Sequence, residues 1–390
     1  MNILDLLKSL FENTAITGFF TGNGWMRLVM ILIGGVFLFL AIKKNFEPYL
    51  LIPIAFGIIL VNIFPSVYIT TTATGEVERG LLGYLHLGVE CELYPCLIFL
   101  GIGATTDFGP LIANKKTMLL GAAAQIGIFI AFFGALLLGM NFYEAASIGI
   151  IGGADGPTAI LTSNRMMAAN GGDNGSFLAA IALAAYSYMA LVPVIFPPVI
   201  RLFTTKKERL IKMEQLREVS KTEKILFPII VTVAVCLIIP AATPLIGCLM
   251  LGNLIKECGV VPNLVNTVAN ALLYICTILL GLSVGATADG TTFLQLSTLK
   301  VFALGVAAFI IAAISGLLFG KIMCKLSKGK INPMIGAAGV SAVPMAARVV
   351  QKEGQREDPS NFLLMHAMGP NVAGVIGSAI AAGILMSIFL

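Results

Sequence analysis

The chain has 390 residues, of which 58% are hydrophobic and only 12% are charged, and its formal net charge at pH 7 is +5. Soluble domains carry about 25% charged residues, so this composition excludes an ordinary soluble globule and indicates an integral membrane protein. The basic residues lie in short loops, where they set membrane orientation. The positive charge therefore does not point to nucleic-acid binding.

The first predicted element is an interfacial helix within residues 1–24, because this stretch holds charges and lacks the cleavage site of a signal peptide. After it, apolar runs close to the ~20 residues that cross a bilayer predict about ten transmembrane helices. They lie at 25–42, 49–66, 84–104, 117–140, 177–203, 225–243, 244–257, 268–288, 301–320 and 362–388. The predicted fold class is an all-α polytopic membrane protein.

Two segments rich in Gly, Ala and Pro do not fit as ordinary spans. They are 144–165, which contains IGGADGPTAI, and 332–350, which reads NPMIGAAGVSAVPMAARVV. The largest polar loop, 204–224, is basic and is therefore placed in the cytoplasm. All the lysine-rich loops lie on the cytoplasmic side only if both segments enter the membrane and return to the side from which they came. We therefore predict two re-entrant hairpins, the first entering from outside and the second from the cytoplasm.

An internal repeat relates the two membrane halves, 25–203 and 225–390. The stretch YPCLIFLGIGATTDFG, at 94–109, matches YICTILLGLSVGATADG, at 274–290, and a Gly-rich segment follows each. By the crossing count the halves have opposite orientation, and such an inverted repeat is typical of secondary transporters. The repeat also matches Asp107 with Asp289, each at the end of a span, where a structural cap or a loop turn is the favoured interpretation.

Asp155 is the first candidate site residue, because it is an ionisable group in an apolar segment beside a Gly-Pro break. Irregular backbone at membrane depth is tolerated where it lines a cavity or is buried in protein. A carboxylate surrounded by hydroxyls and carbonyls suits Na⁺ or a proton. The structural alternative, a cap on the second helix of the hairpin, is compatible with ion binding.

The second hairpin offers Asn332, Gly336, Ser341 and Arg348 as further candidates. An Asn before a Pro is also a helix cap, and a serine among small residues also serves packing. Arg348 ends an otherwise apolar segment, where it could clamp an anion from the cytoplasm or act only as a topology anchor. The residues themselves do not decide between the functional and the structural interpretations.

Two further candidates come from the helices that follow the hairpins. The repeat aligns Tyr188, in AAYSYMALVP, with Asn371, which follows the Gly369-Pro370 break. A buried tyrosine usually donates one hydrogen bond, but beside a cation its hydroxyl could deliver a proton.

Four motifs in order resemble one family, the beta subunit of the sodium-transporting, biotin-dependent decarboxylases of oxaloacetate, methylmalonyl-CoA and glutaconyl-CoA. They are GGADGPTAI (152–160), AAYSYMALVP (184–193), NPMIGAAGVSAVPMAARV (332–349) and HAMGPNVAGVIGSAIAAG (366–383). The resemblance extends over the chain from about residue 25. It implies a multi-pass subunit of a bacterial or archaeal cytoplasmic membrane that decarboxylates carboxybiotin, consumes a proton and drives Na⁺ outward, with a core that slides past a scaffold.

The resemblance also implies roles and partners. Its catalytic residues are Tyr188, Ser341 and Arg348, and its Na⁺-binding residues are Asp155, Asn332, Gly336, Ser341 and Asn371, with the ion itself at Asp155 and Asn371. Its partners are a carboxyltransferase alpha subunit, which chooses the acyl substrate, a biotin carrier, a small gamma or delta membrane subunit, membrane lipid and further copies of the chain. The rival hypotheses are a plain Na⁺-coupled carrier, a Na⁺/H⁺ antiporter and a membrane anchor. Na⁺ stoichiometry, the proton donor and oligomer number stay open.

Overall fold

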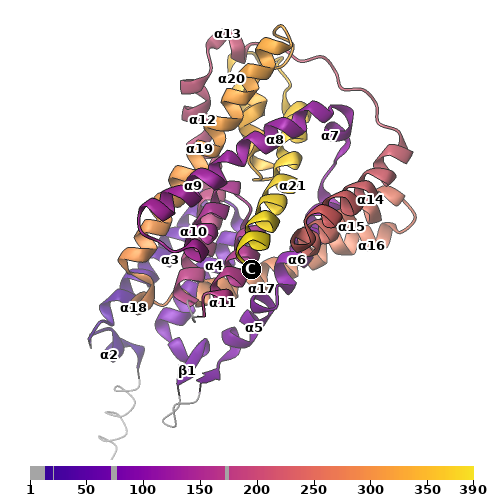
Figure 1. Ribbon diagram of the computed structural model, residues 1–390. Coiled ribbons are helices and arrows are strands. Elements are labelled where there is room, and N and C mark those ends of the chain that lie inside the picture. The colour runs from indigo at the N-terminus through magenta and orange to yellow at the C-terminus, as the bar shows by residue number, and fades with distance from the viewer. Residues whose placement is uncertain (1–13, 21, 72–76, 172–174) are drawn as a thin grey trace, which may run out of the picture.

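Figure 1 shows the computed structural model, in which long helices run side by side and almost no strand is present. The structure describes residues 14–20, 22–71, 77–171 and 175–390. Within these ranges the only strands are β1 (Ile69–Thr71) and β2 (Val77–Arg79), an antiparallel pair with Ile69 opposite Arg79. The predicted all-α class is confirmed, with this small hairpin added to it.

The helices fall into a long and a short set. The longer ones are α3 (Trp25–Lys44), α4 (Pro48–Ile63), α5 (Leu81–Glu90), α6 (Leu93–Thr105), α9 (Ile126–Leu137), α11 (Gly156–Ala169), α12 (Gly175–Phe203), α14 (Lys221–Ile238), α15 (Thr243–Cys258), α17 (Leu273–Ala286), α19 (Leu296–Leu326), α20 (Met345–Glu357) and α21 (Leu364–Phe389). The shorter ones are α2 (Ala15–Phe19), η1 (Pro65–Val67), α7 (Gly109–Ala113), η2 (Lys115–Thr117), α8 (Met118–Ala124), α10 (Phe142–Gly149), η3 (Ile150–Gly153), α13 (Lys206–Arg209), η4 (Pro240–Ala242), α16 (Pro262–Asn266), the π-helical η5 (Thr267–Leu272), α18 (Gly290–Phe293) and η6 (Pro333–Gly339). Of the predicted interfacial helix, residues 1–13 and 21 lie outside the described residues.

Five of the described helical stretches are long and apolar enough to cross a membrane, and bent pairs bring the number to as many as seven. The bends are 65° between α5 and α6 and 61° between the halves of α12. The chain is thus a multi-pass membrane protein. Ten crossings stay a prediction, because α4 and α15 have only 16 residues each and α14 begins with several charged residues.

In the polar segment 204–224, the helices α13 and α14 each begin with a cap that the sequence encodes. Thr205 accepts a hydrogen bond from the backbone N–H of Glu208, whose carboxylate accepts one from the N–H of Thr205. Ser220 and Glu223 form the same reciprocal pair at the start of α14. Such capping boxes satisfy backbone donors that the first helical turn leaves free, so these helix starts follow directly from the sequence.

The helices pack as two groups. The paired group comprises α3 to α6 and α14 to α17, and the hairpin group comprises α8 to α12 and α19 to α21 with η3 and η6. In Figure 1, α14 to α16 lie at the right of the view, and α12, α19 and α20 lie at the upper left. The short helices α7 and α18 link the groups, one in each half of the chain.

Glycines bring the paired group together in two matching contacts. A β-carbon on Gly57 of α4 would lie 2.4 Å from a carbonyl oxygen of α17, and one on Gly285 of α17 would lie 2.1 Å from a carbonyl oxygen of α4. Between α6 and α15, the same distances are 1.9 Å for Gly103 and 2.0 Å for Gly252. Small residues allow membrane helices to approach this closely. The matched contacts support the predicted repeat.

Asp107 and Asp289 cap the two linking helices, as the repeat predicted. The backbone N–H of Gly109 donates to Asp107 Oδ1, and that of Thr291 donates to Asp289 Oδ1, both at 2.9 Å. In Figure 1, α7 lies near the top and α18 near the bottom. These bonds support the structural interpretation of this aspartate pair, and Asp107 also lines the cavity described below.

Candidate functional site

The two Gly-rich segments are both helix–break–helix elements whose breaks touch. In the first, Ala154 has a left-handed φ of 54° between η3 and α11. In the second, the chain is extended at Val340, between η6 and α20. The backbone N–H of Ser341 donates to the carbonyl of Gly153 at 3.1 Å. This bond joins the two breaks and places the residues after each of them side by side.

Asp155 follows the first break and lies at the junction of three segments. Its side chain is 5% exposed, and its Oδ2 accepts a hydrogen bond from Ser378 of α21 at 2.8 Å. Its Oδ1 caps α11 by accepting the backbone N–H of Thr158 at 3.4 Å. The hydroxyls of Ser378 and Ser341 are 3.5 Å apart. The carboxylate thus both caps a helix and faces hydroxyls from two other segments.

Asn371 holds the second break and leaves one oxygen without a partner. Its Nδ2 donates to the carbonyls of Ala338 and Val340 at 2.9 and 2.7 Å. Those acceptors fix which end of the amide is nitrogen. The Oδ1 is buried and has no hydrogen-bond partner among the described residues. A buried acceptor without a donor is costly, and a cation would satisfy it.

The oxygens around Asp155 have the chemistry of a site for a hard cation. Carboxylate, carbonyl and hydroxyl oxygens favour such ions. Within the described ranges, no cluster of three or more His, Cys, Asp or Glu residues could hold a metal ion. One carboxylate among neutral oxygens therefore suits a singly charged cation better than a transition metal.

A cavity of about 600 Å³ opens from this junction. Asp155 and Ser341 lie at its wall, and Glu47, Tyr186, Thr277 and Arg348 are among its other lining residues. The ring of Tyr186 packs against the break, since a β-carbon on Gly156 would lie 2.1 Å from that ring. The Tyr186 hydroxyl is buried and has no hydrogen-bond partner within the described part of the chain. The cavity thus combines a carboxylate, hydroxyls and a cationic side chain.

Arg348 is the cationic group of this cavity. Its side chain is exposed, and none of the described carboxylates lies within 4.0 Å of its guanidinium. Glu47, in the loop before α4, also lines the cavity. Burial raises the pKa of Glu47, and the charge of Arg348 opposes that rise. The guanidinium is therefore available for an anion.

The other predicted site residues lie outside the cavity wall. Tyr188 donates its hydroxyl to the carbonyl of Phe302 at 2.5 Å. Gly336 packs against α19, where a β-carbon would lie 2.0 Å from the carbonyl of Gly316. Asn332 begins η6 and donates instead to carbonyls of the segment that follows α12. The structure thus brings together Asp155, Ser341, Arg348 and the neighbouring Asn371, and it gives the remaining three local structural contacts.

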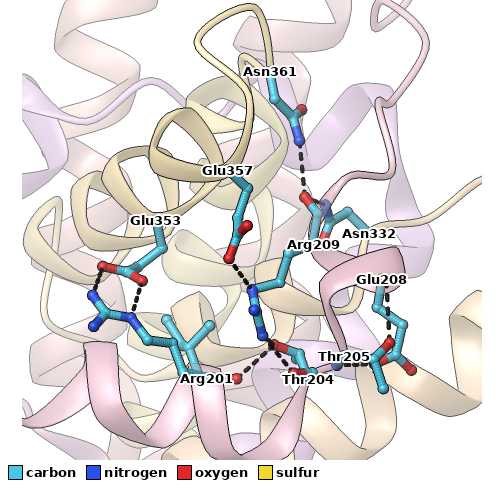
Figure 2. A network of polar contacts seen from close by, with 10 residues as sticks. Arg201, Thr204, Thr205, Glu208, Arg209, Asn332, Glu353, Glu357 and Asn361 are labelled. Atoms are coloured by element: carbon cyan, nitrogen blue, oxygen red, sulfur yellow. Dashed lines mark hydrogen bonds and ion pairs between the residues drawn. The ribbon is translucent and has the colours of Figure 1, made fainter.

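Figure 2 shows the network that contains Asn332. Its amide and that of Asn361 both donate to the carbonyls of Arg209 and Ile211. The ion pair Arg201–Glu353, at 2.6 Å, ties the end of α12 to α20, and the ion pair Arg209–Glu357, at 2.7 Å, ties the segment after α12 to the same helix. These contacts fix the loop after α12 to the second hairpin.

Sequence reasoning missed Ser378, although it lies within the last of the quoted motifs. Seven residues separate it from Asn371, which places both on one face of α21. That spacing is the signal that could have identified it. The contribution of Tyr186 had no such signal, because Tyr186 and Tyr188 stand two apart on a helix and only the packing decides which one faces the cavity.

Comparisons with known proteins agree on one family. The family profile of the Na⁺-transporting oxaloacetate decarboxylase beta subunit matches residues 26–389. The chain is 54% identical to the methylmalonyl-CoA decarboxylase subunit beta of Propionigenium modestum, over 98% of this chain and 100% of that protein. It is 53% identical to the glutaconyl-CoA decarboxylase subunit beta of Acidaminococcus fermentans, over 98% and 97%. It is 48% identical to a probable oxaloacetate decarboxylase beta chain of Vibrio cholerae, over 93% and 95%.

Proposed function

This chain belongs to the family of Na⁺-transporting decarboxylase beta subunits, and we propose that it decarboxylates carboxybiotin and couples that step to outward Na⁺ transport. The observation that carries the proposal is the cavity that Asp155 and Arg348 both line. It offers a cation site and an anion site that share one cavity.

The decarboxylation step uses the anion site. The Arg348 guanidinium binds the carboxylate of carboxybiotin, because its planar fork matches a carboxylate. The bond between the ureido nitrogen and the carboxyl carbon then breaks, CO₂ leaves, and the nitrogen keeps the electron pair and takes a proton. Removal of water from the carboxylate by the apolar cavity wall favours this loss.

The coupling step uses the cation site. Na⁺ binds the Asp155 carboxylate with neutral oxygens from Ser341, Ser378 and Asn371. Its release outward leaves a charge deficit that a proton can fill. A tyrosine of α12 passes that proton to the substrate, and the cavity lining favours Tyr186 for this role, with Tyr188 supporting α19 through Phe302.

The same proposal includes the partners. The chain works beside a carboxyltransferase alpha subunit, a biotin carrier protein or domain and a small gamma or delta membrane subunit, in a homo-oligomer in the cytoplasmic membrane. Biotin stays covalently attached to the carrier and only visits the cavity. The loop 204–224 and the second hairpin then face the cytoplasm, where the carrier arrives.

A carrier or antiporter without biotin chemistry would use a similar cation site. The named relatives favour the decarboxylase, because each is a decarboxylase beta subunit. Avidin separates the two functions, since it blocks only a reaction that requires biotin.

The test compares wild type with Asp155→Asn in the purified beta subunit with its membrane partner, using free carboxybiotin as the substrate. We expect Na⁺-stimulated CO₂ release in wild type and loss of that stimulation in a variant that still assembles. Unchanged turnover and unchanged Na⁺ dependence would reduce Asp155 to the cap of α11.

A further inference from the structure

Gln125 lies at the break between α8 and α9 and has a fixed amide orientation. Its side chain is 6% exposed. Its Nε2 donates to the carbonyl of Gly121 at 3.1 Å and to the carbonyl of Gly374 on α21 at 3.2 Å. Two carbonyl acceptors require the NH₂ end at this position. The oxygen of the amide must therefore point the other way.

The Gln125 Oε1 points toward the Asp155 junction. A β-carbon built on Gly153 would lie 3.6 Å from this oxygen and 3.1 Å from the Cβ of Ser378. Ser378 is the residue whose hydroxyl donates to Asp155. The amide oxygen and the carboxylate thus both lie close to Ser378 and to the first break.

This oxygen has no hydrogen-bond partner in the described part of the chain, and it is buried. Its polar neighbours do not supply a donor: the ionised Asp155 is an acceptor only, and the Ser378 hydroxyl is already committed to Asp155. A buried acceptor beside a carboxylate is unfavourable unless a donor or a cation lies between them.

We infer that Gln125 Oε1 is a further ligand of the Na⁺ held at Asp155. This inference rests on the proposed function, and it adds a residue that neither the motifs nor the repeat singled out. All the ligands then belong to the hairpin group, from the α8–α9 break, the two hairpin breaks and α21. An ion bound by one packing group can move with that group as a unit.

The experiment is equilibrium binding of ²²Na⁺ to the purified complex of the beta subunit with its membrane partner, without carboxybiotin. Gln125→Met keeps the length of the side chain and removes both amide atoms. We expect it to weaken Na⁺ binding about tenfold or more, because one neutral ligand and its orienting bonds are lost. Wild-type affinity in assembled Gln125→Met would overturn the inference and assign a water molecule to this oxygen.

Asn253 offers a matched control. It is 1% exposed on α15, and neither atom of its amide has a hydrogen-bond partner among the described residues. It does not line the cavity. Asn253→Leu should bind Na⁺ as wild type does, and an equal loss in both variants would overturn the inference by assigning the effect to a general loss of buried amides.

Gln125→Glu separates the contribution of the side-chain oxygen from that of the two NH₂ hydrogen bonds. It tests whether the oxygen binds Na⁺ even if Gln125→Met does not assemble. It keeps an oxygen ligand, adds charge and removes the donors to Gly121 and Gly374. Na⁺ affinity within about threefold of wild type, or tighter, supports ligation, whereas a loss of tenfold or more shows that the NH₂ bonds were the essential feature. Asp155→Asn is measured beside it: if it binds Na⁺ normally, the proposed function fails, and if only Gln125 variants bind normally, this inference alone fails.

Discussion

Asp107 and Asp289 make the same pair of contacts in the two halves of the molecule. Each accepts, with Oδ1, the backbone N–H of the residue two positions further on at the start of a linking helix, and each faces a basic side chain from the other half of the chain. Asp289 accepts a hydrogen bond from Arg27 of α3 at 3.0 Å, and Asp107 lies 3.7 Å from Lys224 of α14. The two halves of the repeat thus share an ion pair at the same position as well as their helices. The two ion pairs differ in length and in exposure.

That difference predicts unequal effects of removing the charge. Asn in place of either Asp keeps an oxygen for the cap and loses the ion pair. The side chains of Arg27 and Asp289 are 29% and 17% exposed. Asp289→Asn should therefore lower the free energy of unfolding by about 1.5–3 kcal/mol. The Lys224–Asp107 pair is longer and Asp107 is 44% exposed, so Asp107→Asn should lose at most about 1 kcal/mol. Thermal unfolding of the solubilised protein measures both, and equal losses would contradict the assignment.

The sequence predicts most of the fold because its signals are local. Apolar runs and the short Gly-Ala-Thr-x-Asp motifs that end in Asp107 and Asp289 each depend on residues close in the chain. The number of crossings was less predictable, because α4 and α15 have only 16 residues each. Within the site, Asp155 was evident as a carboxylate beside a Gly-Pro break. Gln125 was not, because its role depends on contacts with segments far away in sequence.

The glycine contacts between α4 and α17 predict strong sensitivity to one methyl group. A β-carbon on Gly285 would lie 2.1 Å from a backbone oxygen, which cannot move without shifting the helix. Gly285→Ala should therefore lower the free energy of unfolding by several kcal/mol, more than the roughly 1–3 kcal/mol of typical overpacking. Gly35 on α3 is the control, because a β-carbon there meets nothing within 4 Å. Gly35→Ala should be neutral or stabilising by about 0.5–1 kcal/mol. Similar thermal midpoints for the two variants would rule out the close contact.

Arg348 should be more sensitive to the shape of its side chain than to its charge. Lys keeps the charge and loses the planar fork, so Arg348→Lys should raise the KM for carboxybiotin about ten- to a hundredfold, roughly 1.5–3 kcal/mol. Arg356, exposed near the end of the same helix, provides the control variant Arg356→Lys. Steady-state kinetics on free carboxybiotin measure both. An unchanged KM in Arg348→Lys would make this residue a topology anchor.

The two tyrosines of α12 should have separable effects. Tyr186 borders the cavity, so removal of its hydroxyl in Tyr186→Phe should lower the decarboxylation rate by about 10²–10⁴-fold, the usual contribution of a general acid. Tyr188→Phe removes the bond to Phe302 and should cost about 0.5–1.5 kcal/mol of stability instead. Rate and unfolding midpoint are measured for each. The reverse pattern would assign the proton to Tyr188.

The loop after α12 should loosen in acid because of Asp358. Its hydrogen bond from Lys212 lowers the pKa of Asp358 from 3.8 to about 2. A depressed pKa means that the contribution to stability is present above pH ~3.8 and is lost as the pH falls toward 2. Pepsin cleavage within 204–220 should therefore be about two- to fivefold faster in Asp358→Asn than in wild type at pH 4, and equal near pH 2. The ratio cancels the pH dependence of pepsin itself. A ratio that stays constant across this range would show that the ion pair does not hold the loop.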